Sequence, residues 1–229
     1  MSVILPVDPP GRPATRRVFL ALVPDPAATE VLTRWLAVPA NGPLPTGWRT
    51  MAAATWHVTL VFLPAVDEAA YRRLAGRITR LAARAVPLPL GWARPGAFPR
   101  AGSAHIAWIG LQDRPTNDGT DLRRPLSTLG AVAGACRRAA AAAGADPDDA
   151  KFRPHLTVGR SSRARDLSGY LALPGAPTGP AWVADRILLV ESQLGKGEQG
   201  RPRYLERAAW RLGAPAPTYV SDPFPGSLD

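Results

Sequence analysis

The sequence predicts a mixed fold of helices and strands, arranged as two similar lobes that face each other. A His-apolar-Thr-apolar pattern occurs twice, at residues 57–60 and 155–158, and each copy lies in a run of apolar and β-branched residues that is typical of a strand. The copies are separated by roughly half of the predicted domain, and helices alternate with strands on both sides of that midpoint. Each half therefore carries one copy of the pattern.

The length and cysteine content indicate a compact intracellular protein. The chain has 229 residues, which is enough for one sizeable domain or for two small lobes that share a core. No run of about 18 apolar residues predicts a membrane span, and the N-terminus lacks the basic region of a signal peptide. The single cysteine, Cys136, excludes an internal disulfide and favours a reducing, cytoplasmic compartment. It lies in an alanine-rich stretch, so we expect a small buried residue.

The chain is strongly basic, with a formal net charge of +10 at pH 7. Nearly all of the positive charge is arginine, because lysine occurs only at Lys151 and Lys196. Codon usage in a GC-rich genome is sufficient to explain this composition. A positive field attracts phosphates, and arginine binds them through paired N–H groups where it is clustered. The charge alone is thus a weak indicator of a nucleic-acid partner.

Both ends of the chain are rich in proline. We predict disordered tails at residues 1–16 and 213–229, which leaves one folded domain at residues 17–212.

The domain begins with a strand and a helix. Residues 17–23 are predicted to form a strand that is buried on both faces. Asp25 and Pro26 are typical of an N-cap and a first helical position. The helix that follows has one apolar face, formed by Val31, Leu32, Trp35 and Leu36.

The alternation of helices and strands continues after the first His strand. A second helix is expected to open at residues 66–68, because apolar residues then recur at helical spacing: Tyr71, Leu74, Ala75, Ile78, Leu81 and Ala82. Residues 88–92 alternate as in a strand, residues 96–99 predict a short break, and residues 104–111 predict another strand.

The second half of the chain predicts a helix, a short helix and a hairpin. A helix is expected over residues 122–143, ended by Gly144. After the second His strand, the basic segment from residue 161 predicts a short helix that ends near residue 173. Residues 182–194 are predicted to form one long strand, with residues 203–212 as its partner in a hairpin.

The hairpin loop contains a Gly-x-Gly-x-x-Gly sequence at residues 195–200, which is the outline of a dinucleotide-binding motif. That motif requires a helix after the third glycine to receive the pyrophosphate. Here a strand-like run follows from Arg203, so we interpret the glycines as a flexible loop.

Within each repeated motif the histidine and the threonine share one face of the strand, because side chains alternate with a period of two. We expect His57 and Thr59 on one face, opposite an apolar set that packs in the core: Trp56, Val58, Leu60 and Phe62. His155 and Thr157 form the equivalent pair. His105 has no threonine two residues later, and we expect it to be structural.

The paired histidines allow four interpretations: a chance match of surface residues, a metal site, core packing, or acid–base catalysis on a phosphoester. Two of only three histidines share the pattern, which disfavours chance. Two histidines are too few ligands for a structural zinc, and the apolar faces already supply a core. In the fourth case one histidine takes a proton from water, the other protonates the leaving oxygen, and each threonine donates to a phosphate oxygen.

The motifs and their flanks resemble the 2H phosphoesterases, which are named for two His-x-Thr motifs. Within that family the chain is most similar to the RNA 2′,3′-cyclic phosphodiesterases, also called the 2′-5′ RNA ligase group. The resemblance covers roughly residues 17–212 and rests on residues 57–63, 96–99, 105–111, 152–160 and 190–194, with Gly200 and Tyr204.

The resemblance implies an α+β fold with two pseudo-symmetric lobes, whose antiparallel sheets line a central groove with helices outside. It implies metal-independent hydrolysis of a terminal RNA 2′,3′-cyclic phosphate to a 2′-phosphate, without a cofactor. By this resemblance His57 is the proton donor and His155 the proton acceptor, although the sequence itself does not assign these roles. Thr59 and Thr157 are expected to hold phosphate oxygens, and Arg160 is the candidate for a further phosphate contact.

Three aromatic residues, Phe19, Phe98 and Trp108, are candidates for stacking on a terminal base, with core packing as the alternative. The expected partners are RNA with 2′,3′-cyclic phosphate ends or small cyclic nucleotides. We expect a cytoplasmic monomer with no membrane and no obligate protein partner. The alternatives are reversible 2′-5′ joining of RNA ends by the same histidines, a non-catalytic module that binds RNA ends, and an interaction protein with a basic surface.

Overall fold

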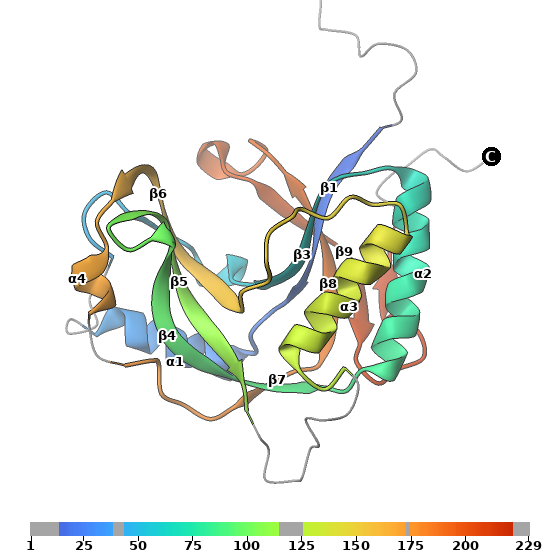
Figure 1. Cartoon of the computed structure of the whole chain (residues 1–229), viewed down its shortest axis with the longest axis horizontal. Coiled ribbons are helices and arrows are strands. Elements are labelled where there is room, and N and C mark those ends of the chain that lie inside the picture. The colour runs from blue at the N-terminus through green and yellow to red at the C-terminus, as the bar shows by residue number, and fades with distance from the viewer. Residues whose placement is uncertain (1–13, 39–43, 115–125, 173–174, 222–229) are drawn as a thin grey trace, which may run out of the picture.

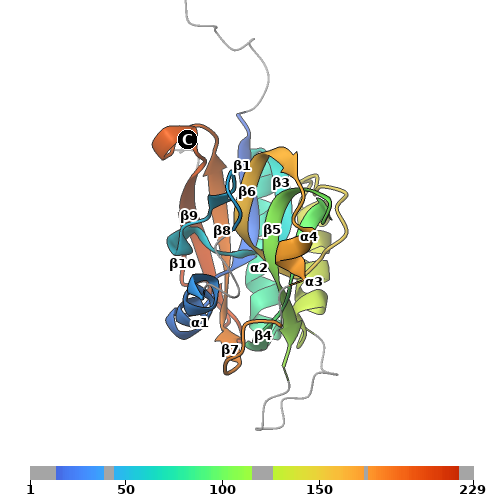
Figure 2. The same ribbon diagram turned by 90° about the vertical axis from the view of Figure 1, so that its left-hand side faces the viewer.

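Two five-stranded antiparallel sheets form the framework of the protein (Figures 1 and 2). The computed structural model describes residues 14–38, 44–114, 126–172 and 175–221. The strand order is β10-β9-β8-β1-β3 in the first sheet and β2-β6-β5-β4-β7 in the second sheet. The two lobes that the sequence predicts are therefore present, one around each sheet.

The first sheet combines strands from both ends of the chain. It consists of β1 (Arg16–Leu22), β3 (Val58–Val66), β8 (Arg186–Gln193), β9 (Arg203–Arg211) and β10 (Tyr219–Val220). Strand β1 lies between β3 and β8, and its last five residues are buried, as predicted.

The second sheet is continuous in the chain apart from one short strand. It consists of β2 (Arg49–Thr50), β4 (Leu88–Arg100), β5 (Ser103–Asp113), β6 (His155–Arg165) and β7 (Trp182–Ala184). Strand β2 pairs with β6 at one edge, and β7 pairs with β4 at the other.

The helices are α1 (Pro26–Ala37), α2 (Glu68–Arg84), α3 (Leu129–Ala142) and the short α4 (Ser168–Leu171). The α1 and α2 starts are as predicted, because Asp25 and Asp67 each accept a backbone N–H bond from the third residue after them at 2.7 Å. Helices α2 and α3 pack together against β9 and β3, on the opposite side of the molecule from α1 and α4 (Figure 1). Among the described residues, no helix is long and apolar enough to cross a membrane.

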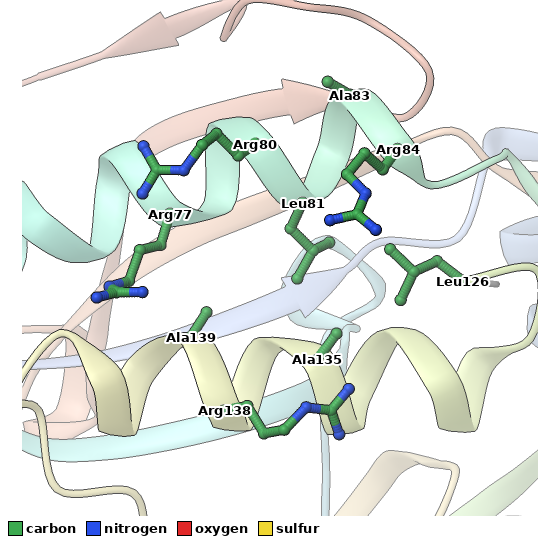
Figure 3. Close-up of a pocket in the computed structure, with 9 residues that line it drawn as sticks. All are labelled: Arg77, Arg80, Leu81, Ala83, Arg84, Leu126, Ala135, Arg138 and Ala139. Atoms are coloured by element: carbon green, nitrogen blue, oxygen red, sulfur yellow. The ribbon is translucent and has the colours of Figure 1, made fainter.

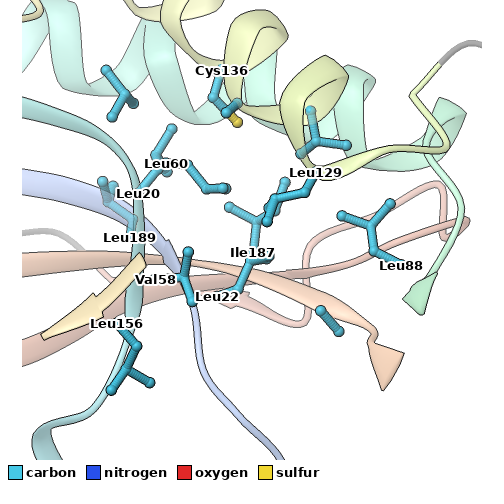
Figure 4. Close-up of a cluster of buried hydrophobic side chains, with 14 of the residues drawn as sticks. Leu20, Leu22, Val58, Leu60, Leu88, Leu129, Cys136, Leu156, Ile187 and Leu189 are labelled. Atoms are coloured by element: carbon cyan, nitrogen blue, oxygen red, sulfur yellow. The ribbon is translucent and has the colours of Figure 1, made fainter. Parts of the chain in front are cut away.

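One apolar core joins the two lobes. Leu20 from the first sheet, Leu156 from the second and Leu129 from α3 are at most 1% exposed in the same cluster (Figure 4). Cys136 of α3 is fully buried there, and burial raises the pKa of its thiol to about 12. This agrees with the expectation of a small core residue.

A β-bulge in β3 changes which of its side chains reach this core. The register against β1 shifts between Thr59 and Val61, which leaves Leu60 as one extra residue. Leu60 and Val61 are consequently both buried in the core. Phe62, which we expected in the core, instead lies on the other face of the first sheet and packs with Phe19 in a second, smaller cluster. The predicted alternation was wrong at Phe62 because the bulge reverses the faces.

The predicted long strand at residues 182–194 was wrong, because it is two strands in different sheets. Strand β7 pairs with β4, whereas β8 pairs with β1 and β9. The break is at Asp185, whose carbonyl accepts a bond from the Leu212 N–H at 2.7 Å and whose carboxylate lies 3.4 Å from Arg186. At this point the chain crosses from one lobe to the other.

Three further segments differ from the prediction. Residues 96–99 remain in β4. Pro95 and Pro99 lie at register shifts of the β4–β5 pair, where the N–H that proline lacks is not needed for a ladder hydrogen bond. Residues 161–165 extend β6, so only α4 is helical in that segment. Helix α3 begins seven residues later than predicted, after the N-cap Thr128; residues 122–125 lie outside the described part.

The C-terminal segment is paired as far as residue 221, although we expected a disordered tail from residue 213. Strand β10 pairs with β9, and the Tyr71 hydroxyl of α2 donates to the Ser221 carbonyl at 2.8 Å. Backbone pairing with β9 thus outweighs the prolines in this segment, although β10 itself is exposed. Residues 1–13 and 222–229 lie outside the described residues, so the outer limits of the domain stay a prediction.

Candidate active site

One small cavity between the two sheets contains both histidine–threonine motifs. It has a volume of about 80 Å³, and strands β3 and β6, from different sheets, approach within 8 Å between Cα atoms beside it. The five residues that the sequence singled out for phosphate chemistry all line it: His57, Thr59, His155, Thr157 and Arg160. Met51, Thr55, Ile106 and Tyr204 complete the lining.

His57 lies just before β3 and is held on three sides. Its Nδ1 lies 2.8 Å from the Thr55 carbonyl. Because a carbonyl only accepts, Nδ1 carries the hydrogen, and Nε2 is the free acceptor of the neutral ring. Phe19 stacks on the imidazole at 4.7 Å between ring centroids, and Tyr204 meets it edge-on at 5.5 Å. The ring orientation is therefore fixed before any ligand binds.

His155, the first residue of β6, has the same local arrangement. Its Nδ1 lies 2.7 Å from the Arg153 carbonyl, again two residues earlier, so Nε2 is again the free acceptor. Phe98 meets the ring edge-on at 4.9 Å, and Trp108 lies 6.0 Å from it. The two motifs are thus equivalent in structure as well as in sequence.

Burial lowers the pKa of both histidines below the usual 6.5. The hydrogen bonds from Nδ1 to the Thr55 and Arg153 carbonyls raise the pKa and oppose this effect without overcoming it. The positive charge of Arg160 lowers both values further, and His155 also lowers the pKa of His57. Both rings are therefore mainly neutral at pH 7 in the free protein.

The three stacking candidates take different positions. Phe19 is only 4% exposed and supports the His57 ring, so its main contact is packing. Phe98 and Trp108 are half-buried beside His155, with their rings 5.3 Å apart. His105 is exposed on β5, with Nδ1 3.3 Å from the Ser161 carbonyl, and does not line the cavity.

Two residues of this region were not predicted from the sequence. Tyr204 of β9 lines the cavity and contacts both Phe19 and His57. Arg49 of β2 is the direct cross-strand partner of Arg160. Tyr204 is one of the residues on which the family resemblance rests, but that resemblance assigned it no role at the site. Both residues are brought to the site by strand pairings that the local sequence does not reveal.

Two larger pockets adjoin the cavity and share Thr55 and Tyr204 with it. The first, called here the apolar pocket, has a volume of about 170 Å³ and is lined by Phe19, Val23, Ala54, Thr55, Trp56, His57, Leu188, Val190, Tyr204 and Glu206. The second, called the arginine pocket, has a volume of about 210 Å³ and is lined by Arg17, Arg49, Thr50, Met51, Ala52, Thr55, Arg160, Ser192, Arg201, Pro202 and Tyr204.

The polar groups of the cavity suit an anion. Its lining contains no Asp or Glu, and its histidine, threonine, arginine and tyrosine side chains are hydrogen-bond donors in at least one protonation state. Across the described ranges, no group of three or more His, Cys, Asp or Glu side chains gathers at a possible metal-binding position. The arrangement can hold a phosphate and move protons on either side of it.

A more spacious pocket, with a volume of about 680 Å³, lies elsewhere. It lies between α2 and α3, where Arg77, Arg80, Arg84 and Arg138 surround an apolar floor (Figure 3). Guanidinium groups stay protonated and cannot exchange protons near neutral pH. We therefore place the candidate active site at the paired histidines.

Comparison with known proteins identifies relatives of this chain. Residues 23–195 match the family model of the 2′-5′ RNA ligase superfamily. An RNA 2′,3′-cyclic phosphodiesterase from Archaeoglobus fulgidus is 29% identical over 119 residues, which are 51% of this chain and 58% of that protein. The match thus spans less than two thirds of the archaeal relative.

Solved structures with similar folds include Escherichia coli LigT. In its apo form LigT superposes with a TM-score of 0.63 and 24% identity, over 86% of this chain and 98% of LigT. TT0787 of Thermus thermophilus gives a TM-score of 0.61 and 20% identity, over 86% and 98% of the two chains. These similarities confirm the predicted α+β fold with two lobes.

Proposed function

This chain belongs to the 2′-5′ RNA ligase superfamily of 2H phosphoesterases and is therefore an enzyme of that class, and we propose that it hydrolyses 2′,3′-cyclic phosphates at RNA ends. The product is a 2′-phosphomonoester. The observation that carries the proposal is the single cavity lined by two equivalent histidine–threonine motifs from opposite sheets.

In-line displacement at phosphorus needs a base on one side and an acid on the other. In the proposed reaction His155 accepts a proton from water through Nε2, and the water oxygen forms a new bond to phosphorus. The bond from phosphorus to the 3′ oxygen breaks, and His57 gives its proton to that oxygen. Thr59 and Thr157 donate hydrogen bonds to the non-bridging oxygens, and Arg160 balances their charge. This sequence of steps requires no metal ion.

The lowered pKa values support this assignment of roles. A neutral His155 is ready to act as a base at pH 7. His57 has one more cause of pKa lowering than His155, namely His155 itself, so a proton on His57 is readily released. His57 must first gain that proton, and a bound anionic phosphate favours this because an opposite charge raises the pKa of a neighbouring imidazole.

Incubation of the purified protein with adenosine 2′,3′-cyclic phosphate tests the proposal. Chromatography separates the 2′- and 3′-monophosphates, and we expect the 2′ isomer. Absence of hydrolysis, or release of the 3′ isomer, would contradict the proposed reaction. Bound ligand without turnover would instead support a non-catalytic module that binds RNA ends.

The same geometry favours a second candidate, reversible 2′-5′ joining of RNA ends. In this reaction a 5′-hydroxyl takes the place of water, gives its proton to His155 and forms the new bond to phosphorus, and His57 again protonates the departing 3′ oxygen. An RNA half with a 2′,3′-cyclic phosphate and a half with a 5′-hydroxyl should then give a longer product on a gel. We predict that hydrolysis dominates over joining. We also propose that the enzyme is a monomer and acts in the cytoplasm.

A further inference from the structure

The catalytic cavity adjoins the arginine pocket, in which Arg160 is the one arginine with a role in the proposed reaction. Arg17 of β1, Arg49 of β2, Arg160 of β6 and Arg201 of the β8–β9 loop all line it. No Asp or Glu is among its lining residues. Four guanidinium groups from four separate segments therefore surround one space of about 210 Å³.

The four arginines repel one another and lack compensating acids. Arg49 and Arg160 are directly opposite across β2 and β6, and like charges at such positions destabilise a strand pair. Arg17 lies over the Phe62 ring at 4.4 Å, and Arg201 donates to the Gln199 amide oxygen at 2.6 Å, so both have neutral partners. In the described part of the chain, none of the four forms an ion pair with a carboxylate. A bound anion would relieve this repulsion.

Three strands show how the pockets are ordered along the groove. On β1 the order runs from Phe19 in the apolar pocket to Arg17 in the arginine pocket, and on β8 it runs from Val190 to Ser192. On β9, Tyr204 lines both pockets and the catalytic cavity. The catalytic cavity therefore adjoins an apolar space in one direction and a cationic space in the other.

A nucleotide with a 2′,3′-cyclic phosphate has the same order of chemical groups. The base is attached to C1′, and the 5′-phosphate is carried by C5′, which is attached to C4′. These two ring carbons lie on either side of the 2′,3′ edge. When the cyclic phosphate occupies the cavity, one of these groups points along the groove in each direction. An apolar pocket suits the base, and guanidinium groups suit the phosphate.

We infer that the arginine pocket binds the 5′-phosphate of the terminal nucleotide, the phosphate that joins it to the rest of an RNA. The inference rests on the proposed function and narrows its substrate class. RNA ends and 5′-phosphorylated nucleotides are the preferred substrates, and cyclic nucleotides that lack a 5′-phosphate are also hydrolysed but bind more weakly.

Binding of two product-like ligands tests this without any need for turnover. Adenosine 2′-monophosphate and adenosine 2′,5′-bisphosphate differ only in the 5′-phosphate. We expect the bisphosphate to bind about tenfold more tightly in calorimetry, or more, because charge-assisted hydrogen bonds to arginine are among the strong ones. Equal affinity of the two ligands would overturn the inference.

Two substitutions locate the effect, and a third controls for net charge. Arg49→Ala and Arg201→Ala alter the arginine pocket, and neither residue lines the catalytic cavity. Both should abolish most of the preference for the bisphosphate. Arg138→Ala removes the same charge from the pocket between α2 and α3 (Figure 3) and should keep the preference. Thermal unfolding of each variant verifies that it is folded.

The results distinguish a local phosphate site in the arginine pocket from a long-range electrostatic effect, and the further inference from the proposed function. Preference retained in both Arg49→Ala and Arg201→Ala, or lost equally in Arg138→Ala, would show a long-range field rather than a local site. If adenosine 2′,3′-cyclic phosphate is hydrolysed but the 5′-phosphate adds no affinity, the inference fails and the proposed function stands. If the preference is present without hydrolysis, the proposed function fails and the phosphate site stands.

Discussion

Replacing His155 with alanine is expected to lower kcat/KM for adenosine 2′,3′-cyclic phosphate by a factor on the order of 10² to 10⁴, the usual contribution of a general base. At about 1.4 kcal/mol for each factor of ten, this is a loss of roughly 3 to 5 kcal/mol of transition-state stabilisation. The assay is initial-rate hydrolysis with chromatographic separation of the product isomers.

The structure indicates that this loss would not come from unfolding. His155 is half-buried, and its Nδ1 hydrogen-bonds to the Arg153 carbonyl. Loss of such a bond costs about 1 kcal/mol of folding free energy. The ring also packs edge-on against Phe98, which stays in contact with Trp108 after the substitution. The variant should therefore fold, and circular dichroism would verify it.

His105 provides a matched control for this experiment. It is the third histidine of the chain, its Nδ1 also lies near a backbone carbonyl, and it lies on β5 outside the cavity. His105→Ala should keep kcat/KM within about twofold, because surface substitutions usually change little. Wild-type activity in His155→Ala, or an equal loss in His105→Ala, would refute the assignment of His155 as the base.

Four further outcomes are expected. Burial lowers the pKa of His57 in the folded state, so the unfolded chain binds more protons than the folded protein as the pH falls below about 6.5. The free energy of unfolding should therefore decrease there. Urea unfolding between pH 5 and pH 8 should show this decrease, and His57→Asn should make it smaller. One base and one acid predict a bell-shaped pH–rate profile. Arg160 lowers the pKa of both histidines, so in Arg160→Met both limbs of that profile should move to higher pH; an unchanged profile would mean that other groups are titrating. Hydrolysis should be insensitive to EDTA, and its loss in chelator would reject the metal-free scheme. The Cys136 thiol, with a pKa of about 12 in the core, should react with a thiol reagent at pH 8 only after unfolding.

The local elements and the two motifs could be predicted because their signals are contained in short stretches of sequence. An aspartate N-cap and a 3.6-residue period define α2, and all six apolar residues expected on its inner face are buried. The period of two places His57 with Thr59, and His155 with Thr157, on shared faces. The family resemblance implied that the motifs meet in one groove, and one cavity contains both, whereas their chemical roles stay predictions.

The assignment of strands to sheets could not be predicted from local patterns. Residues 182–184 and 187–190 are apolar runs that fit either sheet, and only Asp185 and its partners mark the crossing. The bulge at Leu60 could not be predicted from the sequence either, because both Leu60 and Val61 are apolar. Tyr204 and Arg49 reach the site through pairings between distant segments, so no local sequence pattern places them there.

The composition of the first sheet constrains the order in which the chain can fold. Strand β1, near the start, is held between β3 and β8, and β8 in turn requires β9. A ribosome must therefore synthesise almost the whole protein before β1 gains both of its neighbours, whereas residues 49–184 already contain every strand of the second sheet. Pairings between such distant segments are slow to form, because a long loop must close first. A nascent chain should accordingly present His155 on a formed sheet while β1, the only strand partner of β3 in the described part of the chain, still lacks its second neighbour, β8.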